Sequence, residues 1–420
     1  MKQREWLLVI LLVVFGLVYQ VFESGGCSLS RSDIPFIDGS NLASEIYHDF
    51  PGGEKSLLGL TGIMVKNPAG SIKVNGNGSN EAVLRVVYRV HHPDREKAGE
   101  IAAGIQDGFE RSGDQLVLRP NAGDADFPLD RVRVLLELEV PDKCSLDLNN
   151  QFGVVEVDSV SAPLIIGNRH GSTKVEKTAA KLKLRHGHGQ LHLNEVNGPV
   201  EVDVQHSRVV IQNITSLTAK GAYSDFQVKN SAGPVAIEAS FGKLKLEDCR
   251  SLEIDSRHTS INVANVAAGI SIKASYAPLR LERINGDTII TGRNCPISIN
   301  QIQADYLLIK NSYDRVEVNG FRGHQADIDL RHGRLSFSLL ELGGRLNVNA
   351  LHTGITIEYP AGLEPSFNLR ARQGRIVNRG SAVLEILEDR TEQSAFLQAG
   401  SPEIVINASY GSIVLRNNRS

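Results

Sequence analysis

The sequence predicts an all-β fold, a single-stranded parallel β-helix (β-solenoid) of about 14 coils of about 18 residues each. Three observations lead to this prediction. A ring-bearing residue recurs at a fixed interval, a small residue follows it in almost every copy, and apolar-x-apolar pairs flank it on both sides. Such a period indicates a solenoid, in which each repeat buries its apolar face against its neighbours. The ring positions are Phe152, His170, His188, His206, Tyr223, Phe241, His258, Tyr276, Tyr313, His332, His352 and Tyr410, with Asn294 and Gln373 once each in the same slot.

Residues 1–26 predict a membrane anchor or a signal segment. Lys2 and Arg4 precede the apolar run Trp6–Phe22, whose length suits either a short spanning helix or a long signal-peptide core. The positive charges keep the first residues cytoplasmic, so the bulk of the chain is expected outside, in the periplasm or at the cell surface. A retained single-pass anchor in the cell membrane is favoured. A cleaved signal and lipidation of Cys27 remain as alternatives.

Residues 27–60 show no sustained period and predict a linker. Residues 61–141 predict a β-rich cap that closes the first coil, because an open β-helix end is an exposed sheet edge. A short amphipathic helix is expected over residues 94–109. The strand-like runs of the cap are Ile63–Val65, Ile72–Val74, Val83–Val90, Leu116–Leu118 and Val132–Val140.

Residues 142–420 predict the β-solenoid itself. In the copy around His188, Leu182 and Leu184 precede the ring while Leu191 and Leu193 follow it. Alternation with period 2 places one face of each strand inward and the other outward. The interval between Gln373 and Tyr410 is twice the usual period. We therefore expect an excursion over residues 381–402 and a final coil at residues 403–420.

Charge and cysteine usage narrow the function classes. The net charge is −3, and the basic residues are spread along the chain, so nucleic acid is not an expected partner. Cys249 and Cys295 would lie three coils apart, about 14 Å at ~4.8 Å per coil, which is too far for a disulfide. The cysteines are expected as small apolar wall residues.

His170, His188 and His206 are the candidate metal ligands, because they occupy equivalent corners of three successive coils. Imidazole nitrogens bind Zn²⁺ at ~2.0–2.1 Å. Phe and Tyr fill the same column elsewhere, so a stacked ladder of planar side chains is the favoured interpretation. We therefore expect no metal and no cofactor. Arg169, Arg257, Arg293 and Arg331, which precede ring positions, could alternatively form a stripe for an anionic polymer.

A polysaccharide lyase or hydrolase is the enzymatic alternative. Glycosidic cleavage needs two carboxyl groups at a set separation, and the outward column containing Glu156 offers no acidic pair on adjacent coils. Glu201 and Asp203 have no acidic counterpart one coil further on, and Glu247 and Asp248 are expected at a solvated turn. No nucleophile elbow, phosphate-binding glycine loop or CxxC pair occurs. Catalytic residues are therefore not expected.

Short structural motifs carry a resemblance to a known family. Leu138–Pro141 leads into Leu146–Val157, and Asn168–Gly171 and Arg331–Gly333 repeat part of it. This order resembles the bacterial adhesin-like family of β-strand-repeat proteins, of uncharacterised function and related to the toast-rack domains of envelope-stress proteins. The resemblance implies an exported or membrane-tethered β-helix. We expect a non-enzymatic envelope scaffold, adhesin-like or sensing surface, with an envelope protein or glycan as partner and the carbohydrate-active enzyme as the alternative.

Overall fold

The computed structural model describes residues 46–120, 130–398 and 400–418, and from Tyr47 onward the chain forms one compact unit. The described residues are mostly β-strand, with one helix among them, which confirms the all-β class. None of the helices in these ranges is long and apolar enough to cross a bilayer. The anchor or signal segment expected at residues 1–26 lies outside the described residues.

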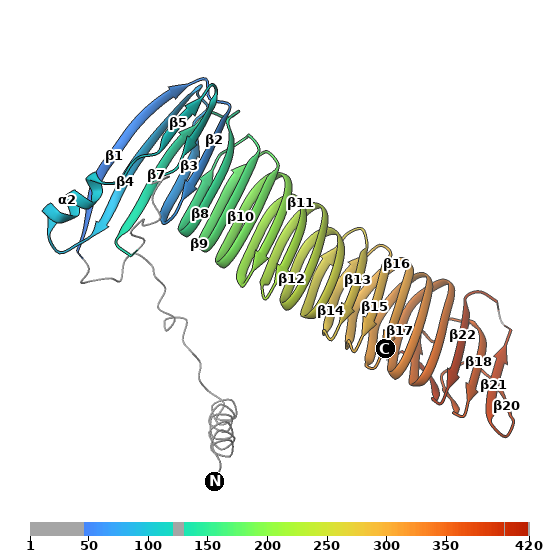
Figure 1. The fold of residues 1–420 in the computed structure, drawn as a ribbon. Coiled ribbons are helices and arrows are strands. Elements are labelled where there is room, and N and C mark those ends of the chain that lie inside the picture. The colour runs from blue at the N-terminus through green and yellow to red at the C-terminus, as the bar shows by residue number, and fades with distance from the viewer. Residues whose placement is uncertain (1–45, 121–129, 399, 419–420) are drawn as a thin grey trace, which may run out of the picture. The chain divides into compact units, whose positions relative to one another are not determined.

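Parallel pairing with a constant sequence offset dominates the structure (Figure 1). Phe152 pairs with His170 and His170 with His188, and the offset continues in the following strands. We call each such segment of about 18 residues, with a strand on either side of the ring position, a rung. The first rungs consist of β8 (Ser145–Asp158), β9 (Leu164–Thr178), β10 (Leu182–Gln205), β11 (Ser207–Ala222) and β12 (Asp225–Val266).

The next rungs keep this pattern with shorter strands. Strands that precede the ring position pair in parallel, each with the next, in the order β12, β13, β15 and β16. Strands that follow the ring position pair in the same way in the order β12, β14 and β16. Both series then continue into one long element. These elements are β13 (Ile270–Ser275), β14 (Leu279–Asn285), β15 (Thr288–Arg293), β16 (Ile297–Ser312) and β17 (Arg315–Tyr359).

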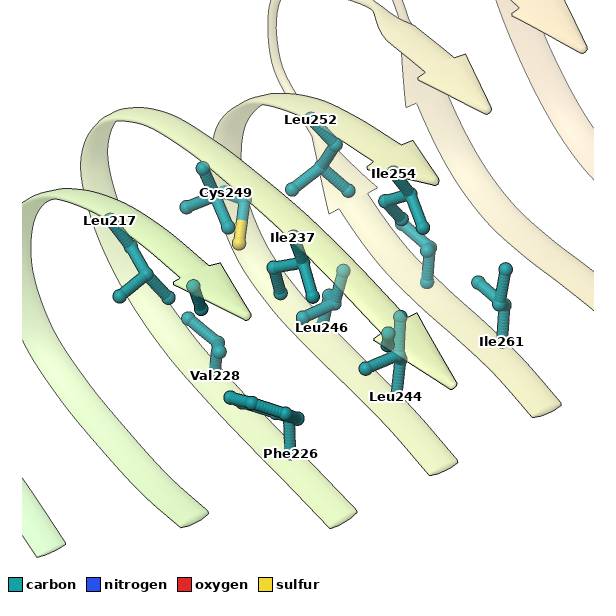
Figure 2. Close-up of a cluster of buried hydrophobic side chains, with 14 of the residues drawn as sticks. Leu217, Phe226, Val228, Ile237, Leu244, Leu246, Cys249, Leu252, Ile254 and Ile261 are labelled. Atoms are coloured by element: carbon teal, nitrogen blue, oxygen red, sulfur yellow. The ribbon is translucent and has the colours of Figure 1, made fainter. Parts of the chain in front are cut away.

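The core lies between the strands of each rung and continues from rung to rung. Figure 2 shows labelled side chains of neighbouring rungs pointing into this shared interior. Leu244 and Leu246 are fully buried, and Phe226 is 2% exposed. Burial of one such side chain contributes about 1.5–3 kcal/mol. Alternation along each strand is therefore the sequence feature that produces the interior.

The N-terminal end contains two layers of parallel strands whose members are far apart in sequence. β2 (Gly62–Asn67) and β3 (Gly70–Gly76) pair in parallel with β8, and β6 (Gln115–Leu118) and β7 (Val132–Val140) pair in parallel with β2 and β3. The prediction that residues 61–141 form a cap separate from the rungs is therefore wrong in its boundary. Parallel pairing depends on matching strands and not on sequence distance, so two rungs lie within this segment.

Antiparallel strands close the N-terminal end. β4 (Glu81–His91) pairs with β7, β1 (Tyr47–Leu58) pairs with β4, and β5 (Phe109–Ser112) pairs with β6. The predicted linker, residues 27–60, is therefore wrong over β1. This strand is mostly exposed and carries a bulge between Pro51 and Gly53, which explains the missing apolar period.

The helix of the cap is shorter than predicted. α2 spans Arg95–Ala103, and the side chain of Asp94 accepts a hydrogen bond from the backbone N–H of Glu96 at its N-cap. Gly104 ends the helix, and Phe109 already belongs to β5. The expected extension to Phe109 is therefore wrong: glycine is a poor helix former, and Gly108, with φ 62°, lies directly before β5.

The C-terminal end reverses the expected order of the last rungs. The final segment pairs in parallel with β17 on one side and with β18 and β19 on the other, so it lies between them. The predicted final coil, residues 403–420, is thus an inserted rung. The predicted excursion contains an antiparallel hairpin that covers β18. The elements are β18 (Ser366–Arg372), β19 (Ile376–Arg379), β20 (Glu385–Glu388), β21 (Glu392–Leu397), β22 (Glu403–Ser409) and β23 (Ile413–Asn417).

Candidate functional site

The ring positions form a stacked column along one corner of the rungs. Ring centroids of stacked neighbours lie 4.6–5.1 Å apart, and their planes differ by at most 19°. Asn294 interrupts the stack between Tyr276 and Tyr313. These distances lie in the range of favourable aromatic stacking. We call the file of rings from Phe152 to Tyr410 the ring column. Because of the inserted rung, His352 stacks on Tyr410.

The backbone at this corner fixes the direction of each ring. From His206 onward the ring residue itself has a positive φ, for example 49° at His206 and 61° at Tyr313. In the first three rungs the following glycine takes the positive φ instead, as at Gly171 with 136°. Later small residues donate a side-chain hydrogen bond to the carbonyl two positions earlier, at Ser207, Ser224, Thr259, Cys295 and Thr353.

The ring column is open to solvent along its length. Tyr223 and Tyr313 are each 56% exposed, and Phe241 is 47% exposed. Because the faces are covered by neighbouring rings, the column presents ring edges and tyrosine hydroxyls. Tyrosine combines apolar area with a hydrogen-bonding group and is enriched in binding surfaces. The arrangement is therefore suited to contact with a partner.

The three candidate metal ligands lie on adjacent rungs of the ring column. His170 stacks between Phe152 and His188, and His188 stacks on His206. Nitrogen lone pairs lie in the ring plane, so the lone pairs of stacked imidazoles run side by side and do not converge. Burial lowers the pKa of His170, with smaller contributions from His188 and Arg169. Among the described residues no group of three His, Cys, Asp or Glu side chains has a metal-binding arrangement.

His186 is a buried titratable group on the inner side of this corner. It is 3% exposed, and its Nδ1 lies 2.9 Å from Ser207 Oγ. Burial lowers its pKa to about 4. In the two preceding rungs the paired positions are Asn168 and Asn150. This column of buried polar residues two positions before the ring was available in the sequence as a periodic signal.

His186 predicts a stability that depends on pH. The folded state holds the neutral imidazole, so its contribution is fully present above the usual pKa of 6.5 and is lost as pH falls toward 4. The corresponding loss is roughly 3 kcal/mol. We expect His186→Asn to remove this loss in chemical denaturation measured at pH 7 and pH 4. His192→Asn, at an outward position of the same strand, should retain it; equal pH dependence of the His186 variant and the native protein would contradict the assignment.

The acidic residues weighed in the sequence form surface pairs. Glu201 Oε1 lies 2.7 Å from Lys181 Nζ, and Glu247 Oε1 lies 2.8 Å from Lys245 Nζ. Asp248 accepts a hydrogen bond from Asn265 at 2.8 Å. Because Glu201, Glu247 and Asp248 each have such a partner, we interpret them as solvated residues with a structural role. Exposed pairs of this kind contribute about 0–1 kcal/mol each.

A second acidic group, which the sequence did not reveal, surrounds a corner hollow of about 630 Å³. Its charged lining combines acids with one arginine and one histidine from successive rungs: Asp287, Asp305, Arg322, His324 and Glu341. The carboxylate of Asp287 accepts a hydrogen bond of 3.0 Å from the backbone N–H of Tyr306. Asp305 and Glu341 belong to rungs two apart, so their spacing along the stack is about 10 Å. The alternation within each strand identifies the outward columns, and this corner lies between the strands.

Three cysteines are buried free thiols in the structure: Cys144, Cys249 and Cys295. Burial raises the pKa of Cys144 and of Cys249 to about 11 each, and it also raises the pKa of Cys295. Such thiols are poor nucleophiles because little thiolate is present near pH 7. They serve as small wall residues of the interior, as the sequence predicts. Cys27 lies outside the described residues.

Comparisons with known proteins add two remote structural similarities. No family model matches the chain, and no curated protein matches it in sequence. A candidate cell adhesion protein from Clostridium sporogenes is similar, with 10% identity over 88% of this chain and 100% of that chain and a TM-score of 0.15. A candidate adhesin from Bacteroides fragilis shares 11% identity over 89% of this chain and 97% of its own, with a TM-score of 0.16. The functional argument therefore depends on the residues of this chain.

Proposed function

We propose that this chain is a single-stranded parallel β-helix, tethered to a cell membrane by its N-terminal segment, that displays a non-enzymatic adhesin-like, scaffold or sensing surface outside the cytoplasm. The observation that carries the proposal is the exposed ring column. Its phenylalanine and tyrosine members are 43–56% exposed, although neighbouring inward positions are fully buried. A contiguous exposed apolar surface on a soluble framework is typical of an interaction site.

The framework supports this role because it holds the column rigidly. Each ring stands on a corner whose φ is set by the rung, and its neighbours restrain the ring by stacking. Little conformational entropy is then lost when a partner orders the surface, which favours binding. Asparagines that follow the second strand of a rung are also hydrogen-bonded from rung to rung. For example, Asn213 Nδ2 donates to Asn194 Oδ1 at 2.9 Å. An envelope protein or glycan is the expected partner.

The test replaces three exposed rings by the residue that the column already tolerates at Asn294. We expect the triple variant Tyr223→Asn, Tyr276→Asn, Tyr313→Asn to bind immobilised envelopes of the source cells at least fivefold more weakly than the native full chain, measured in nanodiscs by surface plasmon resonance. The control carries Thr218→Asn, Glu253→Asn and Thr291→Asn at outward strand positions and should bind like the native protein. Native binding by the folded ring variant would contradict the proposal.

One observation favours the carbohydrate-active alternative, namely the acidic corner hollow. The spacing of about 10 Å between the rungs of Asp305 and Glu341 is slightly greater than the ~6.5–9.5 Å between carboxyl groups in inverting glycosidases. The discriminating assay measures new reducing ends after incubation of the full chain with envelope polysaccharide. The favoured proposal predicts none above background. Release that is abolished by Asp305→Asn would establish the enzyme instead.

A further inference from the structure

A polar hollow of about 970 Å³ lies over the N-terminal rungs, away from the ring column's exposed tyrosines. Strands β2, β8, β9 and β10 are successive neighbours (Figure 1), and one outward column of residues on them borders the hollow. In this column Lys66 pairs with Asn149, Asn149 with Gly167, and Gly167 with Arg185. Lys66 and Arg185 are therefore three rungs apart, roughly 14 Å.

Two glycines form the floor of the hollow. A Cβ at Gly167 would lie 2.7 Å from Asn149 Oδ1, and a Cβ at Gly187 would lie 2.3 Å from the carbonyl oxygen of Arg169. Backbone therefore excludes a side chain at Gly187, whereas at Gly167 the side chain of Asn149 would have to move. The depression exposes strand backbone between the cationic residues on either side.

Four cations line this hollow without an acidic partner among the residues that the structure describes. Lys66, Arg119, Arg169 and Arg185 all border it, and none of them forms an ion pair with another described residue. Nε of Arg119 is buried and has no hydrogen-bond partner among the described groups. On the same face just beyond the hollow, lysines do have partners, as in the pair of Lys220 and Glu238 at 2.9 Å. The unpaired cations are thus a local feature of the hollow.

Buried polar atoms in the wall also lack partners. Asn150 is 4% exposed and His186 is 3% exposed, and both line the hollow. Asn150 Oδ1 and His186 Nε2 have no hydrogen-bond partner in the part of the chain that the structure describes. A buried polar atom without a partner costs about 1–3 kcal/mol. This wall therefore offers hydrogen bonds to a hydroxyl-bearing ligand or to water that such a ligand retains.

We propose that the hollow binds an acidic oligosaccharide whose sugar carboxylates pair with the arginines and whose hydroxyls contact the surrounding amides and carboxylates. Guanidinium groups bind carboxylates through two parallel hydrogen bonds. Asp147 and Asp203 also line the hollow. They accept hydrogen bonds from sugar hydroxyls and disfavour a densely charged polyphosphate. The inference deepens the proposed function, because it names the ligand class and a second binding position.

The experiment titrates the full chain in detergent micelles with tetragalacturonate by isothermal calorimetry. Its methyl ester, which has the same sugars without charge, and inorganic phosphate are the comparison probes. We expect the acid to bind, its affinity to fall with salt, and the ester and phosphate to bind at least tenfold more weakly. The double variant Arg169→Gln, Arg185→Gln should lose at least tenfold in affinity for the acid. Arg257→Gln and Arg293→Gln, at exposed positions outside the hollow, should leave it unchanged.

Equal binding of the ester, or unchanged binding by a double variant with the native melting temperature, would overturn the inference. Phosphate binding as tight as the acid would also overturn it, because it would reveal a simple anion site. The ring variant described above separates the two proposals. If the ring variant loses envelope attachment while the native protein does not bind tetragalacturonate, only the inference about the hollow fails. If acid binding persists while attachment is independent of the rings, only the role of the ring column fails.

Discussion

Removing residues 403–420 should unfold the C-terminal end of the stack. The deletion takes away β22 and β23, which pair with β17 on one side and with β18 and β19 on the other. It also removes four fully buried side chains, Ile404, Ile406, Ile413 and Leu415. At about 1.5–3 kcal/mol for each side chain, the loss is on the order of 6–12 kcal/mol. We expect rapid proteolysis between residues 360 and 397 while the rungs before β17 remain protected.

A pair of point variants separates burial from simple shortening of the chain. Ile406→Asp places a carboxylate in the interior and should reproduce the proteolysis of the deletion. Asn407→Asp lies at the adjacent exposed position and loses only the hydrogen bond to Asn349 Oδ1, so it should remain resistant. Protection of residues 360–397 after the deletion would show that the last segment does not lie between β17 and β18.

Gly171→Ala should be among the most damaging additions of a single methyl group in the first rungs. Gly171 has φ +136°, and an added Cβ would lie 1.9 Å from the carbonyl oxygen of Gly153. The contact is with backbone, so the strands have to separate. Strained backbone and overpacking each cost about 1–3 kcal/mol. Chemical denaturation should therefore show a loss of roughly 3 kcal/mol or more.

Gly354→Ala is the matched control. A Cβ at this position meets no heavy atom within 4 Å. Its effect should stay within about 0.5 kcal/mol, as is usual for surface substitutions. Equal stability of the two variants would contradict the close stacking of the glycine corner on adjacent rungs.

The repeat was predictable because one rung constrains the next. An inward residue such as Leu246 contacts its counterparts in neighbouring rungs, so the same side-chain class recurs at the same interval. The ring column follows the same logic, since each ring packs on the next one, as Tyr223 does on Phe241. These features depend on neighbours about 18 residues away and therefore appear as a period in the sequence.

The ends of the stack were not predictable from that period. β22 lies between β17 and β18, and β3 lies between β8 and β7, so neighbours in space are far apart in sequence. A parallel strand pairs equally well with any strand of matching register, and the sequence carries no signal of the order. β1 was not predictable for a different reason. It is held mainly by backbone hydrogen bonds and buries few side chains, so its sequence shows no apolar alternation.

The hollow over the N-terminal rungs could not be predicted from the sequence, for the same reason as the two ends of the stack. Arg119 and Lys66 come from segments that precede the regular repeat, whereas Arg169 and Arg185 belong to it. The pairing of β6 with β2 and of β2 with β8 brings these cations together. His186 had a visible periodic relation to Asn168, but its burial depends on the corner geometry. Candidate sites that combine an end of the stack with its regular part require the structure.

Distances between spin labels along one outward column test the stacking of rungs most directly. Labels at Glu156 and at Gln227, Asn262 or Arg280 are separated by four, six or seven rungs, as counted along the stacked rings. At ~4.8 Å per rung, electron–electron resonance should give distances of roughly 19, 29 and 34 Å. A linear increase with rung number is the predicted result. Distances that do not grow with rung number would contradict the stack and the ring column built on it.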